Sequence, residues 1–412
     1  MNNFSEYKKD NNNNPDRILY AEASYTEEEI NAVNDVLISS RLSLMAGEKV
    51  KELERSVSRL FNKGYGLMVN SGSSANLIAL LSLQLKEGTK VITPSLTFST
   101  TISPIVQSRL IPYFVDVEKE TLQINMNRVK EICLDNVSAI LVPNLIGNIA
   151  NWEEIYNFSK ENNIAIIEDS ADTIGYIYNT KLDNWSDIST TSFYASHVMT
   201  GAGFGGMISY ENESHYQLGL SLRGWGRRSC LYGETEDYDR RFNTKLDGIY
   251  YDDKYIFDDL AYNFLPSEIS AAFALVQLKK LNSNINKRIE NFSYLRNKLW
   301  HSNNFYIPNS YSNVKTGWLA FPLIFENKLA SKRREIQIFL EKSGIQTRTI
   351  FSGNIMRQPV AKKFEWDRYG SFEISDKIMS CGILLGCHHN QTKQNLEYMV
   401  EKILEAENLF SN

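Results

Sequence analysis

Short apolar runs alternate with amphipathic segments along most of the chain. Val50, Leu53 and Val57 recur at helical spacing, which predicts an amphipathic helix. Between about residues 64 and 172 the apolar runs are short and rich in β-branched side chains, as is typical of buried strands. This alternation of strands with helical segments predicts an α/β fold whose sheet is mixed and mostly parallel.

The pattern changes near residue 263. The segment 263–300 predicts one long helix between two domains, and the residues after it mix helices with a few strands such as "WLAFPLIF". We therefore expect a smaller C-terminal α+β domain that packs with the N-terminal segment. The expected division is a flexible N-terminal arm (1–17), a large domain (18–280) and a small domain (281–412).

Composition excludes several classes of protein. The 412 residues, 42% of them hydrophobic, are enough for a substantial core. A formal net charge of −5 without a basic cluster argues against nucleic acid as a partner. No apolar run reaches the roughly 20 residues that cross a bilayer, and the polar, Asn-rich N-terminus has no signal-peptide core. Together with only four cysteines, this predicts a cytoplasmic protein in a reducing compartment.

The sequence "NSGSSAN" (70–76) follows a predicted strand. Gly72 permits a tight turn, and Ser73 and Ser74 open a helix whose free N–H groups and hydroxyls can hold a phosphate. An ordinary serine N-cap is the better interpretation for this motif taken alone.

Two further strand ends carry candidate site residues. Asp169, in "IIEDSAD", can pair with a cationic ring nitrogen, and Glu168 and Asp172 flank it; a helix-capping role is about equally plausible. Phe98 ends a strand in a Ser/Thr-rich loop and can stack on a flat ligand, although core packing is favoured for a lone phenylalanine. Ligand sites in parallel sheets lie at such strand ends.

The stretch "TTSFYASHVMTGAGFGGMISY" (190–210) contains the fourth feature. Ser192 offers a further phosphate contact, and His197 follows it by five residues. The glycine run allows close approach of backbone to a ligand. It is not a dinucleotide-binding fingerprint, because it precedes a strand rather than a helix.

In order and spacing, these motifs resemble the pyridoxal-phosphate sugar aminotransferase family (DegT/DnrJ/EryC1/StrS). The matching segments are "NSGSSANLIAL", "PSLTFSTT", "EDSADTIG", "SFYASH…GAGFGGM", "LRGWGR" and "YNFLPSEISAAFALVQL". The resemblance implies the aspartate aminotransferase-like fold, which is pyridoxal-phosphate fold type I, with pyridoxal 5′-phosphate or pyridoxamine 5′-phosphate as cofactor. Asp172, in the matching segment "EDSADTIG", is also expected to contact the cofactor.

The family implies a role for each matching residue. The serines of the first motif and Ser192 hold the cofactor phosphate, Asp169 meets the pyridine nitrogen, and the aromatic ring of Phe98 stacks on the cofactor. An asparagine like Asn263 reaches the phosphate from the neighbouring subunit, which implies a homodimer with a shared active site.

At position 197 this family's aminotransferases carry a lysine that binds the cofactor covalently. A primary amine is required for that bond, and an imidazole cannot form it. His197 resembles instead the histidine of the family's sugar 3-dehydratase branch, where it acts as a base near neutral pH. The resemblance implies removal of the C3 hydroxyl from a nucleotide-linked 4-keto-6-deoxyhexose. A decayed aminotransferase is the alternative.

One type in this branch carries a [2Fe–2S] cluster and uses electrons from a reductase; the other has no cluster and takes its amine from glutamate. Segments 240–263 and 347–359 resemble the iron–sulfur type. The cluster cysteines are missing, however: Ala171 stands at one position, and "RSCLYGETEDYD" offers only Cys230. Since four ligands are needed, we expect no iron–sulfur cluster, no other metal, and L-glutamate as amine donor.

Candidate substrate contacts are less specific. Arginines suit the diphosphate or the carboxylate of glutamate, although a surface ion pair is an equally good interpretation of each. An aminotransferase and a non-catalytic binder of sugar nucleotides remain alternative functions. The candidates are Tyr194, Arg223, Arg227, Arg348, Asn354 and Arg357, with Trp225 either lining the site or packing.

Overall fold

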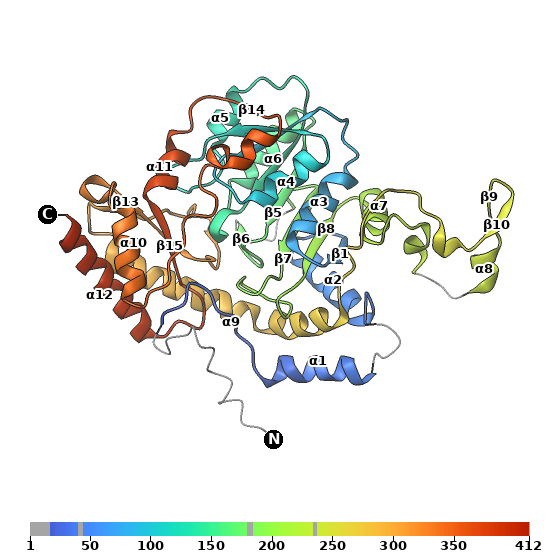
Figure 1. The fold of residues 1–412 in the computed structure, drawn as a ribbon, viewed down its shortest axis with the longest axis horizontal. Helices are drawn as coiled ribbons and strands as arrows, with labels where there is room; N and C mark the ends of the chain where they lie inside the picture. Colours follow the sequence, from blue (N-terminus) through green and yellow to red (C-terminus); the bar gives the residue numbers. More distant parts are fainter. Residues whose placement is uncertain (1–16, 40–43, 179–183, 234–236, 412) are drawn as a thin grey trace.

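An eight-stranded sheet forms the centre of the computed structural model, which describes residues 17–39, 44–178, 184–233 and 237–411 (Figure 1). The strand order is β1-β8-β7-β5-β4-β2-β3-β14. All neighbouring pairs are parallel except those that β8 makes with β1 and β7, so the predicted mixed, mostly parallel sheet is confirmed. The strands are β1 (Tyr65–Val69), β2 (Lys90–Pro94), β3 (Ile111–Val115), β4 (Val137–Pro143), β5 (Ala165–Ser170), β7 (Ile188–Ser192), β8 (Gly206–Tyr210) and β14 (Asp367–Arg368).

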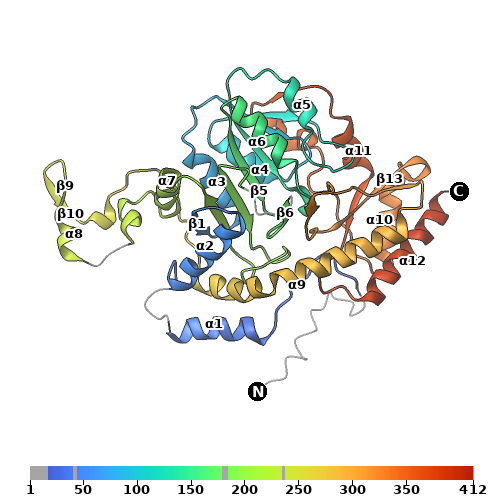
Figure 2. The ribbon, with the colours of Figure 1, turned by 180° about the vertical axis from the view of Figure 1, so that it is seen from behind.

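Helices cover both faces of this sheet (Figures 1 and 2). One apolar core joins the sheet to α3, α4 and α7, and a second joins the opposite face to α5 and α6. The strands are buried on both faces, which explains their continuous apolar runs. The helices are α2 (Glu48–Leu60), α3 (Gly72–Ser82), α4 (Ser99–Gln107), α5 (Met126–Glu131), α6 (Trp152–Glu161) and α7 (Glu213–Arg223).

The predicted long helix is confirmed as α9 (Glu268–Leu299), which runs from beneath the large sheet to the C-terminal part (Figure 2). There a three-stranded antiparallel sheet, β11-β13-β15, packs with α10 and α12 around its own core. The boundary predicted at residue 280 falls inside α9. The C-terminal elements are β11 (Phe305–Tyr306), β13 (Phe321–Phe325), α10 (Arg333–Lys342), α11 (Glu373–Cys381), β15 (Gly382–Leu385) and α12 (Lys393–Phe410).

The N-terminal segment lies against the C-terminal part, as expected. Ile18 bridges to Ile345, and the Ile18 N–H donates to the Gly344 carbonyl at 2.9 Å. Helix α1 (Glu27–Ser39) then packs along α9. Most of the predicted arm (1–17) falls outside the described residues. A short pair, β6 (Ile177–Tyr178) with β12 (Val314–Lys315), links the large domain to the segment after α9.

One feature that the sequence pattern did not predict is a projection formed by residues 228–262. It extends away from the body at the right of Figure 1 and consists of α8 (Tyr238–Phe242), the hairpin β9 (Thr244–Leu246) and β10 (Ile249–Tyr251), and short 3₁₀ turns. Leu260 and Tyr262 at its base are 102% and 75% exposed. In the part of the chain that the structure describes, no helix is long and apolar enough to cross a membrane.

Candidate active site

A cavity of about 900 Å³ opens at the carboxyl ends of β5 and β7, where a parallel sheet is expected to place its ligand. The large domain supplies the N-terminus of α3 and the strand-end loops. The C-terminal part closes the other side with Leu319, Arg348 and Phe351, and the N-terminal segment adds Tyr20. We call this space the central cavity. It brings together segments that lie more than 300 residues apart.

The N-terminus of α3 forms one end of the central cavity. Ser71 is the N-cap and accepts the Ser74 N–H at 3.1 Å, whereas the Ser74 hydroxyl donates to Asn70 at 2.6 Å and Ser74 is not among the residues that line the cavity. Gly72, Ser73 and Ser192 do line the cavity. The helix N-terminus and these hydroxyls form the expected anion cradle.

Gly72 is required for this cradle. A Cβ atom at this position would lie only 2.7 Å from the Cβ of Ser192, so a larger residue would push β7 and α3 apart. The close approach of the two segments brings a second hydroxyl to the same end of the cavity.

Asp169 lies at the end of β5 and is 5% exposed. Its Oδ2 accepts from the Asn76 amide and the Thr101 hydroxyl, both at 2.8 Å, and its Oδ1 accepts the Ala171 N–H at 3.2 Å. Burial raises the pKa of this carboxyl, against the effect of these donors. Oδ1 keeps acceptor capacity toward the cavity, which suits a cationic ring nitrogen.

Asn76 and Thr101 were not predicted as site residues, although both line the central cavity. Asn76 is buried and also accepts from the Thr190 hydroxyl at 2.5 Å. A polar side chain in the otherwise apolar helix "ANLIALL" was the available signal, because a buried amide needs a specific partner.

Asp172 also lines the cavity, close to Asp169. Its Oδ2 accepts the Ile146 N–H at 2.9 Å. Burial, with a smaller contribution from the negative charge of Asp169, raises the pKa of Asp172 to about 7. A carboxyl in this state can donate or accept a proton near neutral pH.

His197 lines the central cavity on the turn after β7. Its backbone N–H donates to the Tyr194 carbonyl at 3.1 Å, and its ring meets the Tyr194 ring edge-on with centroids 5.8 Å apart. The imidazole Nδ1 is buried and has no hydrogen-bond partner. Among the described residues, no lysine lines this cavity.

The burial of His197 sets its protonation state. Burial lowers its pKa to about 4; a contact with the Ser192 backbone opposes the shift, and the positive charge of Arg288 adds to it. Protonation therefore costs about 3 kcal/mol more than in water. The imidazole is neutral above about pH 5, the form a base requires.

Phe98 stands on the wall of the cavity and is 50% exposed. Its ring meets Phe351 edge-on, with centroids 6.0 Å apart. Half of the side chain is therefore accessible from the cavity, in contrast to a phenylalanine packed in the core. Tyr194 is 59% exposed on the lining.

Of the predicted arginines, only Arg348 lines the central cavity. Arg223 does not line the cavity of its own chain: its side chain is 12% exposed, pairs with Glu54 at an N–O distance of 2.7 Å and donates to the Met68 carbonyl at 3.1 Å, and its contact with substrate stays a prediction. Arg227 lies outside the lining as well. Its guanidinium is held among three aromatic rings, 4.3 Å from the ring centroid of Trp225.

Asn354 and Arg357 do not line the central cavity either, and their contacts with substrate stay predictions. Asn354 is fully buried, accepts the Met356 N–H at 3.1 Å and donates to Asp376 at 2.8 Å, and Arg357 forms a two-pronged ion pair with the same carboxylate. Their loop reaches the cavity through other residues, namely Phe351, Ser352, Gln358 and Val360.

Asn263 is exposed at the base of the projection and does not line its own chain's central cavity. Its carbonyl accepts from the Asn70 amide at 3.5 Å, and its side-chain oxygen accepts the Leu265 N–H at 3.0 Å. Its predicted contact with a phosphate therefore remains a prediction about a second copy.

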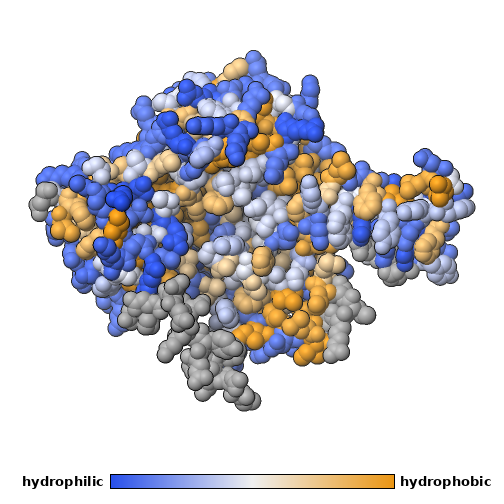
Figure 3. All heavy atoms as spheres, in the orientation of Figure 1, coloured by the Kyte–Doolittle hydropathy of each residue, from blue (hydrophilic) through white to orange (hydrophobic). Residues whose placement is uncertain are grey.

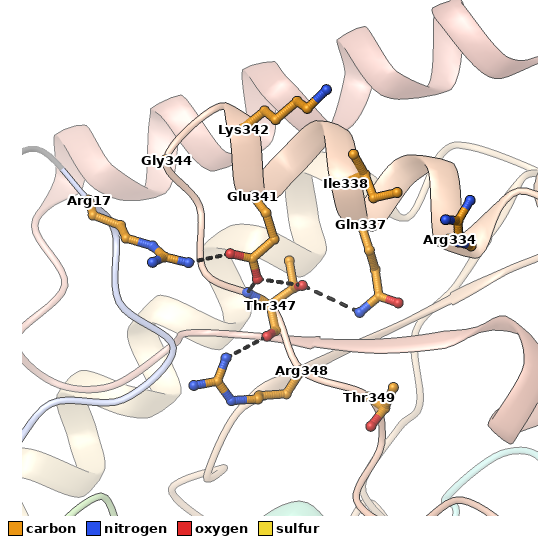
Figure 4. A pocket seen from close by; sticks show the side chains of 10 residues that line it. All are labelled: Arg17, Arg334, Gln337, Ile338, Glu341, Lys342, Gly344, Thr347, Arg348 and Thr349. Atoms are coloured by element: carbon orange, nitrogen blue, oxygen red, sulfur yellow. Dashed lines mark hydrogen bonds and ion pairs between the residues drawn. The ribbon is translucent and has the colours of Figure 1, made fainter. Parts of the chain in front are cut away.

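A second hollow, of about 780 Å³, lies on the C-terminal part and shares Arg348 and Thr349 with the central cavity (Figure 4). Arg17 pairs there with Glu341, which also accepts from the Thr347 N–H at 2.6 Å. The side chains of Arg334 and Lys342 point away from this pair. The Arg17–Glu341 pair joins the N-terminal segment to α10. Because the cationic side chains around this hollow do not converge on one point, it is a poor candidate for a ligand site.

The four cysteines are free and lie apart. Cys381 and Cys387 are buried in the C-terminal part, Cys230 faces the Gly224 carbonyl at 3.5 Å, and Cys133 is exposed. Across the described ranges, no three His, Cys, Asp or Glu side chains are grouped so that they could hold a metal ion.

Comparison with known proteins finds relatives that are similar over most of this chain. Lipopolysaccharide biosynthesis protein RfbH of Salmonella typhimurium is 31% identical over 88% of this chain and 86% of its own. dTDP-4-dehydro-2,6-dideoxy-D-glucose 3-dehydratase of Saccharopolyspora spinosa is 32% identical over 88% of this chain and 81% of its own.

Among solved structures, GDP-4-keto-6-deoxymannose-3-dehydratase with a trapped PLP-glutamate geminal diamine has a TM-score of 0.83 at 27% identity, over 93% of this chain and 99% of that one. The described fold thus has a counterpart among solved structures. The model of the DegT/DnrJ/EryC1/StrS aminotransferase family matches residues 23–404, and this chain therefore belongs to that family.

Proposed function

We propose that this chain is a pyridoxal phosphate- and pyridoxamine phosphate-dependent nucleotide-sugar 3-dehydratase. It removes the C3 hydroxyl of a nucleotide-linked 4-keto-6-deoxyhexose, without an iron–sulfur cluster and with L-glutamate as amine donor. The observation that carries the proposal is His197 in a lining without lysine. Relatives named as 3-dehydratases support it.

The central cavity fits the cofactor by the chemistry of its donors. Gly72, Ser73 and Ser192 offer the phosphate a helix N-terminus and hydroxyls. Asp169 offers a buried carboxylate to the ring nitrogen at the opposite end, and Phe98 offers a free aromatic face between them. The bound cofactor supplies an amine that condenses with the substrate ketone, together with an electron sink for elimination.

His197 then moves the protons. Its neutral imidazole would accept a proton from a carbon close to the substrate ketone. The imidazolium would then donate that proton to the C3 hydroxyl, which leaves as water. Burial disfavours the charged form, so the proton is released readily. Since an imidazole cannot bind the cofactor covalently, Asp169 and the anion cradle provide the retention.

Arg348 is the arginine that fits a carboxylate or diphosphate. It is exposed and lines the central cavity, and its backbone exchanges hydrogen bonds with Leu384 at 3.0 and 2.7 Å. The strand β15 thus fixes its position. Its Nη1 donates to the Thr347 carbonyl at 2.8 Å, and the other N–H groups of the guanidinium can bind a planar oxyanion. The carboxylate of glutamate and the substrate diphosphate are its two candidate partners.

The product distinguishes dehydration from amino transfer. The protein, incubated with pyridoxal phosphate, L-glutamate and a GDP-, CDP- or dTDP-linked 4-keto-6-deoxyhexose, should release ammonia and 2-oxoglutarate and yield a sugar nucleotide lighter by one oxygen. Mass spectrometry and an ammonia assay measure both. A stable amino sugar without ammonia would establish an aminotransferase, and absence of turnover with every nucleotide would favour a binding protein.

Replacement of His197 by lysine tests the missing covalent bond. His197→Lys should retain the cofactor through borohydride reduction and denaturation, because its amine can bond to the aldehyde. Its dehydration rate should fall by about 100-fold or more, since the base is lost. Intact-protein mass spectrometry reads the bond, with His197→Asn as a non-covalent control. Unchanged dehydration in His197→Lys would refute the role of His197.

We also propose that the active unit is a homodimer in which the projection reaches the partner. Its apolar side chains are exposed, with Leu260 and Tyr262 the most prominent, and an apolar patch at the end of α1, which includes Ile38, is also uncovered (Figure 3). Such surfaces mark interfaces. Asn263 lies exposed at the base of the same projection, and in the proposed dimer it reaches the phosphate end of the partner's cavity.

Light scattering tests this assembly. The wild type should have twice the chain mass of 47.3 kDa, and Leu260→Asp should be monomeric with pyridoxal phosphate affinity reduced about tenfold or more, because a buried charge disrupts an apolar interface. Trp300→Asp, at a site 61% exposed after α9, is the matched control. A monomeric wild type with full cofactor affinity would contradict the shared site.

A further inference from the structure

The backbone at Ile146 adopts a conformation that a β-branched residue rarely takes. Ile146 has φ +62° and ψ +15°, and its side chain is fully buried. A left-handed conformation in isoleucine is a genuine outlier, since its Cβ crowds the backbone. Such strain persists only where the surroundings impose it. Here its consequence is specific: the Ile146 N–H points at Asp172 and donates to its carboxylate at 2.9 Å.

The C-terminal part clamps this strained turn from the other side. The Leu319 N–H donates to the Ile146 carbonyl at 2.8 Å. Gly147, with φ +77°, packs so closely that a Cβ atom there would lie 2.7 Å from the Leu319 nitrogen. The Thr316 hydroxyl adds a bond to the Gly147 carbonyl at 2.6 Å. Both peptide groups of the turn are therefore tied to segment 316–319.

Arg288 fixes that segment in turn. It lies on α9, is 0% exposed, and its Nη1 donates to the Trp318 and Leu319 carbonyls at 3.1 and 3.0 Å. No acidic side chain among the described residues forms an ion pair with it. A buried guanidinium devoted to two backbone carbonyls is costly, and its Nε has no partner.

We propose that Arg288, the Leu319 peptide and the left-handed Ile146 form a positioning relay that fixes the Asp172 carboxyl in the central cavity. Through these hydrogen bonds, the position of the C-terminal part determines the position of the Asp172 carboxyl, which lies beside Asp169 in the large domain. Asp172 is thereby held with one oxygen bonded to Ile146. The role of Arg288 in the reaction rests on the proposed function; the relay itself is a property of the fold.

The variant Arg288→Lys tests the relay, because lysine keeps the charge but its shorter side chain cannot span both carbonyls. The Ile146 amide should exchange its hydrogen about tenfold faster or more, as expected for a loosened backbone hydrogen bond. The value of kcat should fall about tenfold or more, with KM and pyridoxal phosphate affinity within about threefold, because Asp172 lines the cavity and a small displacement of a carboxyl beside the reacting groups is costly. Arg296→Lys, on the same helix and paired with Asn309, should change neither quantity.

The exchange experiment requires no substrate, so it judges the relay even if the protein is not a dehydratase. A folded Arg288→Lys whose Ile146 amide is as protected as in the wild type would overturn the relay. Faster exchange with unchanged kcat would overturn the importance of the Asp172 position for the reaction.

A second variant covers the case in which Arg288→Lys does not fold. Gly147→Ala should speed exchange at the Ile146 amide by displacing the Leu319 peptide. Gly88→Ala is its control, because Gly88 has nearly the same φ, +76°, but has open space where the Cβ would go. Equal exchange at Ile146 in the two variants would overturn the relay, since both carry the same backbone strain.

Discussion

The central cavity is organised by the burial of one carboxylate. Asp169 is nearly inaccessible to water, and a buried charge is tolerated only where hydrogen bonds or an opposite charge compensate it. Asn76, Thr101 and the Ala171 N–H provide part of this compensation. Burial nevertheless raises the pKa of this carboxyl. A cationic ring nitrogen beside it would stabilise the charged form.

The second constraint is the imidazole at position 197. A lysine there would hold the ring by a covalent bond, whereas His197 leaves retention to the two ends of the cavity. Burial keeps the His197 imidazole neutral, which is the form that the proposed role as a base requires. Under the proposed function, both the retention of the cofactor and the proton transfer therefore depend on the residue at position 197. In the proposed homodimer, Asn263 of a second copy would complete the phosphate end.

Sequence patterns predicted the architecture well, since it depends on local periodicity. The short β-branched runs became the strands of the sheet, and the apolar spacing after residue 263 became α9. Gly72, Asp169, Ser192 and His197 were predicted to converge because each follows a strand, and parallel strands end at one edge. This edge is where the structure places them.

Tertiary contacts explain what sequence could not predict. Arg223 and Asn354 lie near family motifs, but each side chain bonds to a carboxylate, Glu54 or Asp376, whose position depends on distant segments. Asn76 and Tyr20 were not predicted as site residues, because they reach the cavity only through the tertiary arrangement of the folded chain. The left-handed Ile146 has no sequence signature, because isoleucine is disfavoured in that conformation.

A crystal structure of the protein soaked with pyridoxal phosphate tests the central claim most directly. The account predicts a separate ring in the central cavity, with its nitrogen within hydrogen-bonding distance of Asp169, its phosphate at Gly72 and Ser73, and no covalent bond to any side chain. Continuous density from the ring to a protein amine, or a cavity that excludes the ring, would contradict it.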